Sequence, residues 1–182
     1  MGKSIKELKQ KKMQKKIDAM SNHIIICGYG RNGKQAAKKL LAHKRSFVVI
    51  EKEKERVKKY QSHIVPFVEG NANDDEILKH AGIERADTLI SALPSDSDNL
   101  FVVLSARQIN KTIHIISRAS QETTYSKLKL AGANNVILPD MIGGDHMASL
   151  VVVPDLVEFI DNLGIVGERN INIEEVKVEQ LY

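Results

Sequence analysis

A short apolar strand that runs straight into a glycine-rich loop and then a helix is the feature that most constrains this chain. Residues 24–33 read Ile-Ile-Ile-Cys-Gly-Tyr-Gly-Arg-Asn-Gly, and a helix-forming stretch continues to Ala42. In a G-x-G-x-x-G loop, Gly28 allows the tight turn, Gly30 lets the backbone approach a pyrophosphate, and Gly33 lets the helix pack closely on the strand. The positive end of the helix dipole then faces the anion. The sequence therefore predicts a dinucleotide-binding unit.

A carboxylate follows the second apolar run at the distance that such a site requires. Residues 47–50 lead into Glu51, about 20 residues past the glycine loop, where an acidic side chain can take both ribose hydroxyls. Because a carboxylate there repels a 2′-phosphate, NAD(H) or an adenosine nucleotide is favoured over NADP. The alternative is that Glu51 is a surface residue at a strand end, followed by the solvated run 52–56.

Apolar runs alternate with helical patterns over residues 24–138. The runs lack polar alternation, which is typical of a parallel sheet buried on both faces. Right-handed crossovers then predict an α/β fold with a Rossmann-like, doubly wound, six-stranded sheet in the order 3-2-1-4-5-6. The expected strands are 24–27, 47–51, 64–69, 88–92, 113–117 and 136–138, and Pro66 indicates that the third of them is short or irregular. The expected helices are 33–42, 54–61, a segment capped by Asp74 and Asp75 up to Ala81, a segment opened by Asp96 or Asp98 up to Ile109, and 121–131.

The pattern changes after Pro139, which is expected to close the sixth strand. An apolar segment, 141–153, is followed by Pro154, which breaks the helix, and by a second short helix over 156–163. This helix–turn–helix is more apolar than one sheet face needs, which predicts a dimerisation segment over 141–165; internal packing is the alternative. Residues 171–181 alternate apolar and polar side chains, which predicts one or two strands of a further, truncated domain over residues 166–182.

The basic charge of the chain is concentrated at its N-terminus. Residues 1–20 hold seven lysines against Glu7 and Asp18, so the rest of a chain with a formal charge of +4 is close to neutral. Residues 1–21 are expected to form a basic linker helix whose lysines lie near an anionic membrane surface, and a solvated lead-in is the alternative. The near-neutral remainder, 22–140, disfavours a nucleic-acid partner.

The cysteine and the histidines are not spaced as in a catalytic or metal-binding site. The one cysteine, Cys27, cannot form an internal disulfide, which is typical of a reducing compartment, and it is expected to be a buried apolar residue. The six histidines show no metal-ligand spacing, so no metal site and no catalytic residue are expected. No apolar stretch reaches the roughly 18–20 residues that span a bilayer, and no signal peptide is visible, so the chain is expected to be soluble.

Several short motifs, taken in series, match one known family. They are I-I-I-C-G-Y-G-R-N-G at 24–33, V-V-I-E at 48–51, V-E-G-N-A at 68–72, A-D-T-L-I-S-A-L at 86–93, D-N-L-F-V-V-L-S-A-R at 98–107, I-I-S-R-A at 115–119 and L-K-L-A-G-A-N-N-V-I-L-P at 128–139. Together with the helical pair around Pro154, the series resembles the N-terminal lobe of RCK domains, also called TrkA-N or KTN domains, over about residues 22–165.

The resemblance implies nucleotide contacts beyond the glycine loop. Arg31, Asn32 and Arg118 would reach phosphates, and Asn71, where the family often has aspartate, would lie near the adenine. The complete set of expected contacts is Gly28, Tyr29, Gly30, Arg31, Asn32, Gly33, Glu51, Lys52, Asn71, Ala72, Ala92, Leu93, Asn99 and Arg118. Arg118 as a salt-bridged surface residue and Asn99 as a helix-face residue are the alternatives. The carboxylates with which some family channels bind calcium are absent near Arg118 and Ser120.

The resemblance also implies a regulatory function in which the chain catalyses no reaction. It indicates a regulatory domain on the cytoplasmic face of the plasma membrane that binds NAD(H) or an adenine nucleotide (AMP, ADP or ATP) and gates potassium transport. The expected partners are a channel pore domain and a second copy through residues 141–163, with assembly into a ring as a further step. Membrane contact is expected only through the linked pore or the basic tail. The alternative is a fragment of an NAD-dependent oxidoreductase, for which too few residues follow the sixth strand to form a substrate domain.

Overall fold

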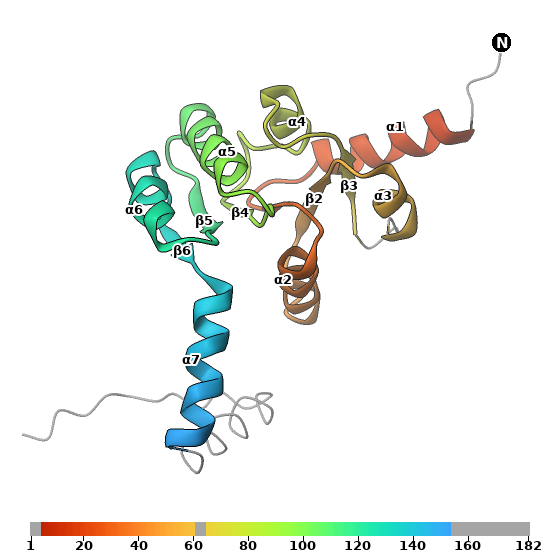
Figure 1. Cartoon of the computed structure of the whole chain (residues 1–182). Coiled ribbons are helices and arrows are strands. Elements are labelled where there is room, and N and C mark those ends of the chain that lie inside the picture. The colour runs from red at the N-terminus through yellow and green to blue at the C-terminus, as the bar shows by residue number, and fades with distance from the viewer. Residues whose placement is uncertain (1–4, 61–64, 154–182) are drawn as a thin grey trace, which may run out of the picture. The chain divides into compact units, whose positions relative to one another are not determined.

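An all-parallel sheet of six strands organises the first of the chain's two units (Figure 1). The computed structural model describes residues 5–60 and 65–153. The first unit comprises residues 1–139 and the second residues 140–182. The strand order, β3-β2-β1-β4-β5-β6, is the doubly wound order that the sequence predicts, and it confirms a Rossmann-like fold.

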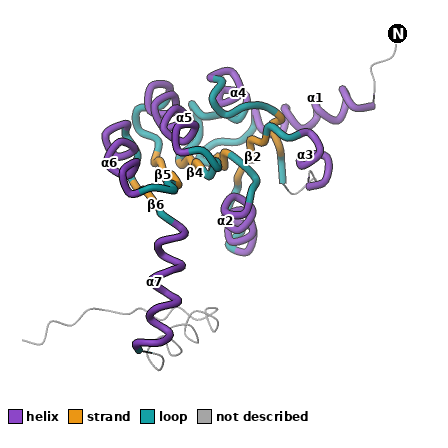
Figure 2. The backbone as a smooth tube through the Cα atoms, in the orientation of Figure 1, coloured by secondary structure: helices purple, strands orange, loops and turns teal. Residues whose placement is uncertain are grey.

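Strands and helices alternate along the first unit, as the tube in Figure 2 shows. The strands are β1 (Ile24–Cys27), β2 (Phe47–Glu51), β3 (Phe67–Glu69), β4 (Thr88–Ser91), β5 (His114–Arg118) and β6 (Asn135–Ile137). The helices of this unit are α1 (Ile5–Asp18), α2 (Arg31–Ala42), α3 (Lys54–Tyr60), α4 (Asp75–His80), α5 (Asp96–Ile109) and α6 (Glu122–Ala131). One further helix, α7 (Pro139–Val152), leads into the second unit.

Helices cover both faces of the sheet, which explains the continuous apolar runs of its strands. Every residue of β1 and β2 is buried. On one face, a cluster that includes Ile17, Leu78 and Val102 joins the sheet to α1, α4 and α5. On the other face, Ala37 of α2 and Val57 of α3 pack against the strands. Each fully buried Val, Leu or Ile side chain of these clusters stabilises the fold by roughly 1.5–3 kcal/mol.

Several element boundaries differ from the sequence prediction by one or more residues, and two of the differences involve a proline. Strand β3 begins at Phe67, after Pro66, which has no N–H for the ladder; residues 61–64 lie outside the described residues. Helix α5 begins at Asp96 and ends at Ile109, as predicted, and its N-cap is Ser95, whose side chain accepts from Asp98 N. Pro139 does not close β6 but is the first residue of α7, where a missing N–H costs nothing.

The C-terminal half of α1 is attached to the core of the first unit. Ile17 is 1% exposed, and the Gln14 amide donates to the His80 carbonyl of α4 at 2.9 Å. Arg85, which follows α4, donates through Nε to the Met20 carbonyl at 3.2 Å. These contacts exclude a solvated lead-in for this half of the helix. None of the helices in the described ranges is long and apolar enough to cross a bilayer.

The joint between α1, α4 and β1 contains a buried histidine. His23 is fully buried, with Nε2 2.8 Å from the Ala81 carbonyl, and Nδ1 has no partner among the described residues. Burial, helped by the nearby Arg85 charge, lowers the pKa of His23, against the opposing effects of the Ala81 hydrogen bond and of Asp87. The folded state therefore favours the neutral imidazole.

Acid is expected to destabilise the first unit through His23. Since the folded-state pKa lies below the unfolded value, this stabilisation is complete above the unfolded pKa and is lost as the pH falls towards the folded pKa. Urea unfolding at pH 7.5 and at pH 5 measures the effect. The free energy of unfolding of His23→Gln is expected to fall less over this range than that of the native chain. An equal fall in both proteins would contradict this assignment.

Candidate functional site

A cleft of about 440 Å³ lies at the carboxyl ends of the strands, where the order reverses between β1 and β4. This is the place at which open α/β sheets bind ligands. All but two of the residues that the sequence analysis selected line it: Gly28, Tyr29, Gly30, Arg31, Asn32, Glu51, Lys52, Asn71, Ala72, Ala92, Leu93 and Arg118. The exceptions are Gly33 and Asn99. The sequence analysis missed Lys34, Ile50, Glu53, Arg56, Gly70, Pro94 and Asp98, which line the same cleft.

The three glycines of the loop have distinct geometric roles. Gly28 has a φ of +92°, in the left-handed region that favours glycine. A Cβ on Gly33 would collide with the Gly28 carbonyl oxygen, so only glycine lets α2 pack this closely on the loop. A Cβ on Gly30 would meet no atom within 4 Å, so this backbone faces open space. The loop thus has the closely packed base and the open rim that a bound pyrophosphate requires.

Helix α2 begins at this loop with its N-terminus uncapped. Gly30 is the N-cap residue, no side chain among the described residues caps the helix, and its first turn contains no acidic residue. The first-turn N–H groups therefore remain available, with the positive end of the helix dipole behind them. This arrangement favours an anion at the rim of the cleft.

Glu51 is a buried carboxylate and not a surface residue. It is 3% exposed, and its Oε2 accepts from Tyr29 N at 2.9 Å and from Arg56 Nη1 at 3.0 Å. Its Oε1 accepts from Glu53 N at 2.9 Å. Burial alone would raise the pKa of Glu51, but the hydrogen bonds from Glu53 N, Tyr29 N and Arg56 outweigh burial and lower the pKa. The carboxylate is therefore ionised, and it ties the glycine loop to the end of β2.

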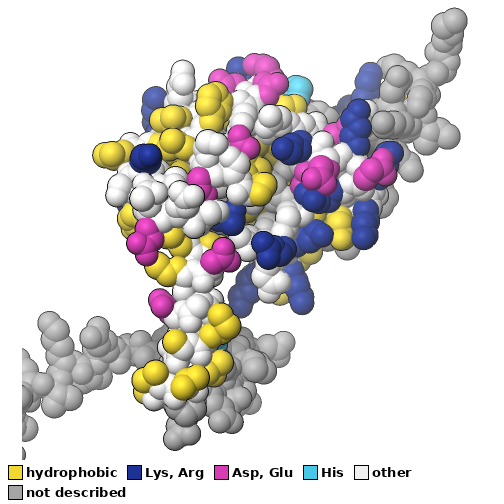
Figure 3. Space-filling model, viewed as in Figure 1, with side chains coloured by type: hydrophobic (Ala, Val, Ile, Leu, Met, Phe, Trp, Pro, Cys, Tyr) yellow, Lys and Arg dark blue, Asp and Glu magenta, His cyan; other side chains and the backbone are white. Residues whose placement is uncertain are grey.

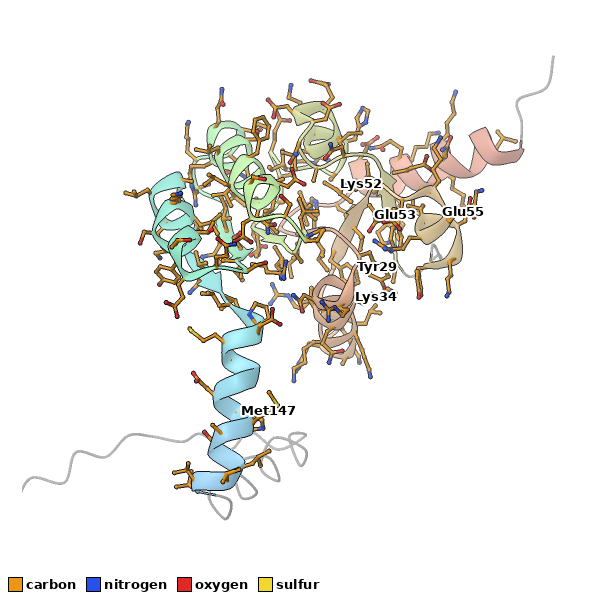
Figure 4. The ribbon with its side chains drawn as sticks, viewed as in Figure 1. Tyr29, Lys34, Lys52, Glu53, Glu55 and Met147 are labelled. Carbon is orange, nitrogen blue, oxygen red and sulfur yellow. The ribbon has the colours of Figure 1, made fainter. Side chains whose placement is uncertain are left out.

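The Tyr29 side chain anchors the glycine loop from the sheet side. Its ring makes edge-to-face contacts with Tyr60, at 5.4 Å between centroids, and with Phe67, at 5.0 Å. Lys34 donates to the Tyr60 hydroxyl at 2.9 Å and lies 4.2 Å from the centroid of that ring. Figure 4 shows Tyr29 and Lys34 close together beside α2, with Lys52 and Glu53 between β2 and α3. The loop is thus held by aromatic packing as well as by Glu51.

Asn99 supports the cleft from behind. It is fully buried, and its Oδ1 accepts from Ser91 Oγ at 2.7 Å and from Leu93 N at 3.1 Å. Its Nδ2 donates to the Leu93 carbonyl at 3.0 Å. Because these bonds engage both ends of the amide and Asn99 does not line the cleft, direct ligand contact is not supported. The side chain fixes the loop after β4.

Arg118 reaches from the end of β5 to that same loop. Its Nη1 donates to the carbonyls of Leu93 at 3.0 Å and Pro94 at 3.1 Å. In the described part of the chain its buried Nε has no partner. The guanidinium lines the cleft and is bonded to backbone carbonyls, which disfavours the alternative of a salt-bridged surface residue.

A polar bridge joins the two halves of the sheet at the far end of the cleft. Asn71 Oδ1 accepts from Asn73 N at 3.0 Å in the loop after β3. Asn73 Nδ2 donates to Asp98 Oδ1, on the first turn of α5, at 3.0 Å. Ala72, between them in the chain, is buried and apolar. The cleft therefore has an apolar floor and amide groups at this end.

Cations outnumber acidic groups around the cleft. Arg31, Lys34, Lys52, Arg56 and Arg118 line it against Glu51, Glu53 and Asp98. A positive excess in a concave site attracts anionic ligands. None of the described residues that line the cleft is a histidine. Burial raises the pKa of the Cys27 thiol to about 12, so this thiol is not a nucleophile. Within residues 5–60 and 65–153, no three His, Cys, Asp or Glu side chains gather as a metal site.

A larger hollow, of about 760 Å³, lies between α1 and α3 over β3. Its walls are mostly apolar, with Met13, Ile17 and Phe67 among them. It contains neither the glycine loop nor an uncapped helix N-terminus. The smaller cleft is therefore the better candidate for an anionic ligand.

Comparison with known proteins gives one consistent family. Residues 24–139 match the sequence model of the TrkA-N domain. The probable potassium channel protein 2 of Methanocaldococcus jannaschii is 40% identical over 163 residues, which cover 87% of this chain and 47% of that protein. The chain thus spans less than half the length of this curated relative.

Solved structures agree with the sequence match. The TrkA-N domain of the inner membrane protein ybaL from Escherichia coli is 35% identical with a TM-score of 0.69, covering 72% of this chain and 98% of that one. The GsuK channel bound to ADP is 32% identical (TM-score 0.63; 72% of this chain, 34% of that one). The GsuK channel bound to NAD is 26% identical (TM-score 0.60; 66% and 22%). On the match over residues 24–139, the doubly wound sheet and these relatives, the chain belongs to the TrkA-N domain family.

Proposed function

We propose that this chain is the ligand-sensing RCK domain of a potassium channel or transporter, and that it binds NAD(H) or an adenine nucleotide in the cleft at Gly28–Gly33. The observation that carries the proposal is the open space at Gly30, beside the uncapped N-terminus of α2 and the ionised Glu51. The potassium-channel relative and the ADP- and NAD-bound GsuK structures support it.

Different residues of the cleft are placed to bind the phosphates, the ribose and the adenine of such a ligand. The glycine loop, Arg31 and Arg118 offer N–H groups and positive charge to phosphates. Glu51 offers a carboxylate to the ribose at the end of β2. Asn71 and Ala72 provide an amide and an apolar floor for the adenine. A ligand held in this way regulates transport if it binds two arrangements of the assembly with different affinity.

The cleft favours sensing over catalysis. A hydride-transfer enzyme needs a proton donor or acceptor beside the nicotinamide. In the described ranges, 5–60 and 65–153, no histidine lines the cleft, and the lowered pKa of Glu51 makes this carboxylate a poor proton acceptor. The chain is therefore proposed to bind the nucleotide without turning it over.

The remaining expectations concern assembly and location. We propose that α7 forms part of a homodimer interface and that the dimer joins a ring on the cytoplasmic side of a membrane pore. Within α7, Met147, Val151 and Val152 are 67%, 83% and 76% exposed, and Figure 3 shows yellow hydrophobic side chains along this helix. A surface of this kind marks an interface. The expected second helix of the pair, residues 156–163, and the tail 166–182 lie outside the described residues.

A thermal-shift panel with AMP, ADP, ATP, NAD⁺ and NADH tests the proposal. A ligand that binds only the folded state raises the apparent Tm, by an amount that grows with its concentration. Potassium flux through the full membrane protein, reconstituted in vesicles, is then expected to change with the nucleotide that shifts Tm. A panel in which no nucleotide shifts Tm contradicts the proposal, as does steady NADH production by the pure protein.

Replacing Glu51 by glutamine is expected to weaken adenine-nucleotide binding by roughly 1–3 kcal/mol, because a charged acceptor for the ribose is lost. Isothermal calorimetry measures the change. Glu55→Gln is the matched control, because Glu55 is exposed on α3, pairs with Lys58 and is not among the residues that line the cleft. If both variants bind the nucleotide as the native chain does, Glu51 does not hold the ribose.

A further inference from the structure

We infer that Arg56 sets the ribose specificity of the cleft, by occupying one acceptor position of Glu51 and by offering its guanidinium to a phosphate on the ribose. This inference rests on the proposed function of the cleft. It concerns a residue that the glycine-loop and ribose-carboxylate pattern does not include.

The hydrogen bonds of Glu51 leave little room for a ribose diol. An ionised carboxylate has about four acceptor positions. Tyr29 N, Glu53 N and Arg56 Nη1 take three of them, all at 2.9–3.0 Å. Two of these donors belong to the backbone and are fixed by the fold, whereas Arg56 is a side chain that is 31% exposed. While Arg56 stays in place, Glu51 can accept from one ribose hydroxyl and not from two.

The guanidinium also changes the charge that a ribose phosphate would meet. Arg56 pairs with Glu51 through Nη1 and with Glu53 through Nη2 at 2.9 Å, and all three residues line the cleft. With Lys52 beside them, this end of the cleft carries two positive and two negative groups. A lone carboxylate would repel a 2′-phosphate strongly, but this cluster has no net charge.

The position of Arg56 affects the binding of NAD⁺ and of NADP⁺ differently. The native chain is expected to prefer NAD⁺ over NADP⁺ only modestly, since Arg56 offsets the repulsion by Glu51. Without Arg56, Lys52 would be the remaining cation of this cluster when Glu51 and Glu53 face the 2′-phosphate, and Glu51 would have a second free acceptor position for the second hydroxyl. Arg56 thus raises the affinity for NADP⁺, and it lowers the affinity for NAD⁺ or leaves it unchanged.

Calorimetric titration of the native chain and of Arg56→Gln with NAD⁺ and NADP⁺ tests this inference, because the two probes differ by one phosphate. Arg56→Gln is expected to weaken NADP⁺ binding about tenfold, the effect of removing one nearby charge, and to leave NAD⁺ binding unchanged or tighter. Arg56→Lys, which keeps the charge, is expected to restore part of the NADP⁺ affinity. AMP and adenosine 2′,5′-bisphosphate form a second pair with the same difference.

The control is Lys58→Gln, which removes one positive charge from the same helix. Lys58 pairs with Glu55 and does not line this cleft, so the ratio of the two affinities is expected to stay at its native value. A ¹³C NMR titration of the Glu51 carboxyl in the ligand-free protein gives an independent reading, and its pKa is expected to rise in Arg56→Gln.

The outcomes separate this inference from the proposed function. If Arg56→Gln loses affinity for NAD⁺ and for NADP⁺ by the same factor, Arg56 has a structural role. This result overturns the inference, while the proposed function stands. If Arg56→Gln binds both NAD⁺ and NADP⁺ with their native affinities, the inference is also overturned and the proposed function also stands. If no nucleotide of either pair and none of the thermal-shift panel binds the native chain, the proposed function fails and the inference fails with it.

Discussion

Replacing Gly30 by valine is expected to reduce nucleotide affinity by at least about a hundredfold while the fold stays intact. The Cβ of residue 30 would point into open space at the rim of the cleft, where the pyrophosphate is proposed to lie. The backbone tolerates the change, because Gly30 has a φ of −79° and a ψ of −159°, which any residue adopts. Calorimetry with the nucleotide that binds the native chain measures the loss, and the Tm without ligand measures the fold.

Gly33→Val is the contrasting variant in the same loop. Its side chain would collide with the Gly28 carbonyl oxygen, so the expected effect is a lower Tm without ligand. If Gly30→Val binds nucleotide as tightly as the native chain, the rim of the loop is not part of the site. If Gly30→Val loses stability as Gly33→Val does, the open space at Gly30 does not exist in solution.

A double substitution in α7, Met147→Glu with Val151→Glu, is expected to convert a dimer into a monomer. The two side chains lie four residues apart on one face of the helix and are 67% and 83% exposed. Burying each across an interface contributes roughly 1.5–3 kcal/mol, and a two-fold axis would use each residue twice. The dimer dissociation constant is therefore expected to rise by at least about a hundredfold.

Sedimentation velocity at micromolar concentration checks this result, and nucleotide affinity is expected to be retained. Ser149→Glu, on the same helix, is a control for the added charge, because Ser149 is a polar residue whose hydroxyl donates to the Asp145 carbonyl. A native chain that sediments as a monomer at micromolar concentration would contradict the interface and remove the mechanical link between ligand and pore.

The sequence predicts the sheet and the glycine loop well because both depend on local patterns. The continuous apolar run 24–27 identifies a buried strand, and the spacing of Gly28, Gly30 and Gly33 fixes the turn that follows it. Glu51 was found by its distance from that loop. The strand order then follows from the handedness of parallel crossovers, which leaves few alternatives.

Side-chain reach across the fold could not be predicted in the same way. Lys34 and Arg56 line the cleft because Lys34 is held by Tyr60 and Arg56 by Glu51, and neither contact has a sequence signature. Asn99 was expected to touch the ligand, but its amide is used by Ser91 and Leu93. By contrast, Pro66 does indicate in the sequence that the third strand is short or irregular, because the proline lacks an N–H for the ladder, and β3 begins only at Phe67.

Amide chemical-shift mapping tests the location of the site most directly. In a ¹⁵N-labelled sample of the native chain titrated with ADP or NAD⁺, we expect the largest shifts at Gly28–Gly33, at Lys52 and Glu53, and at Ala92 and Leu93. These amides surround the open rim, the ribose carboxylate and the loop after β4. Saturable shifts confined to the hollow between α1 and α3, or no saturable shift with either nucleotide, would contradict a nucleotide site in the cleft at Gly28–Gly33.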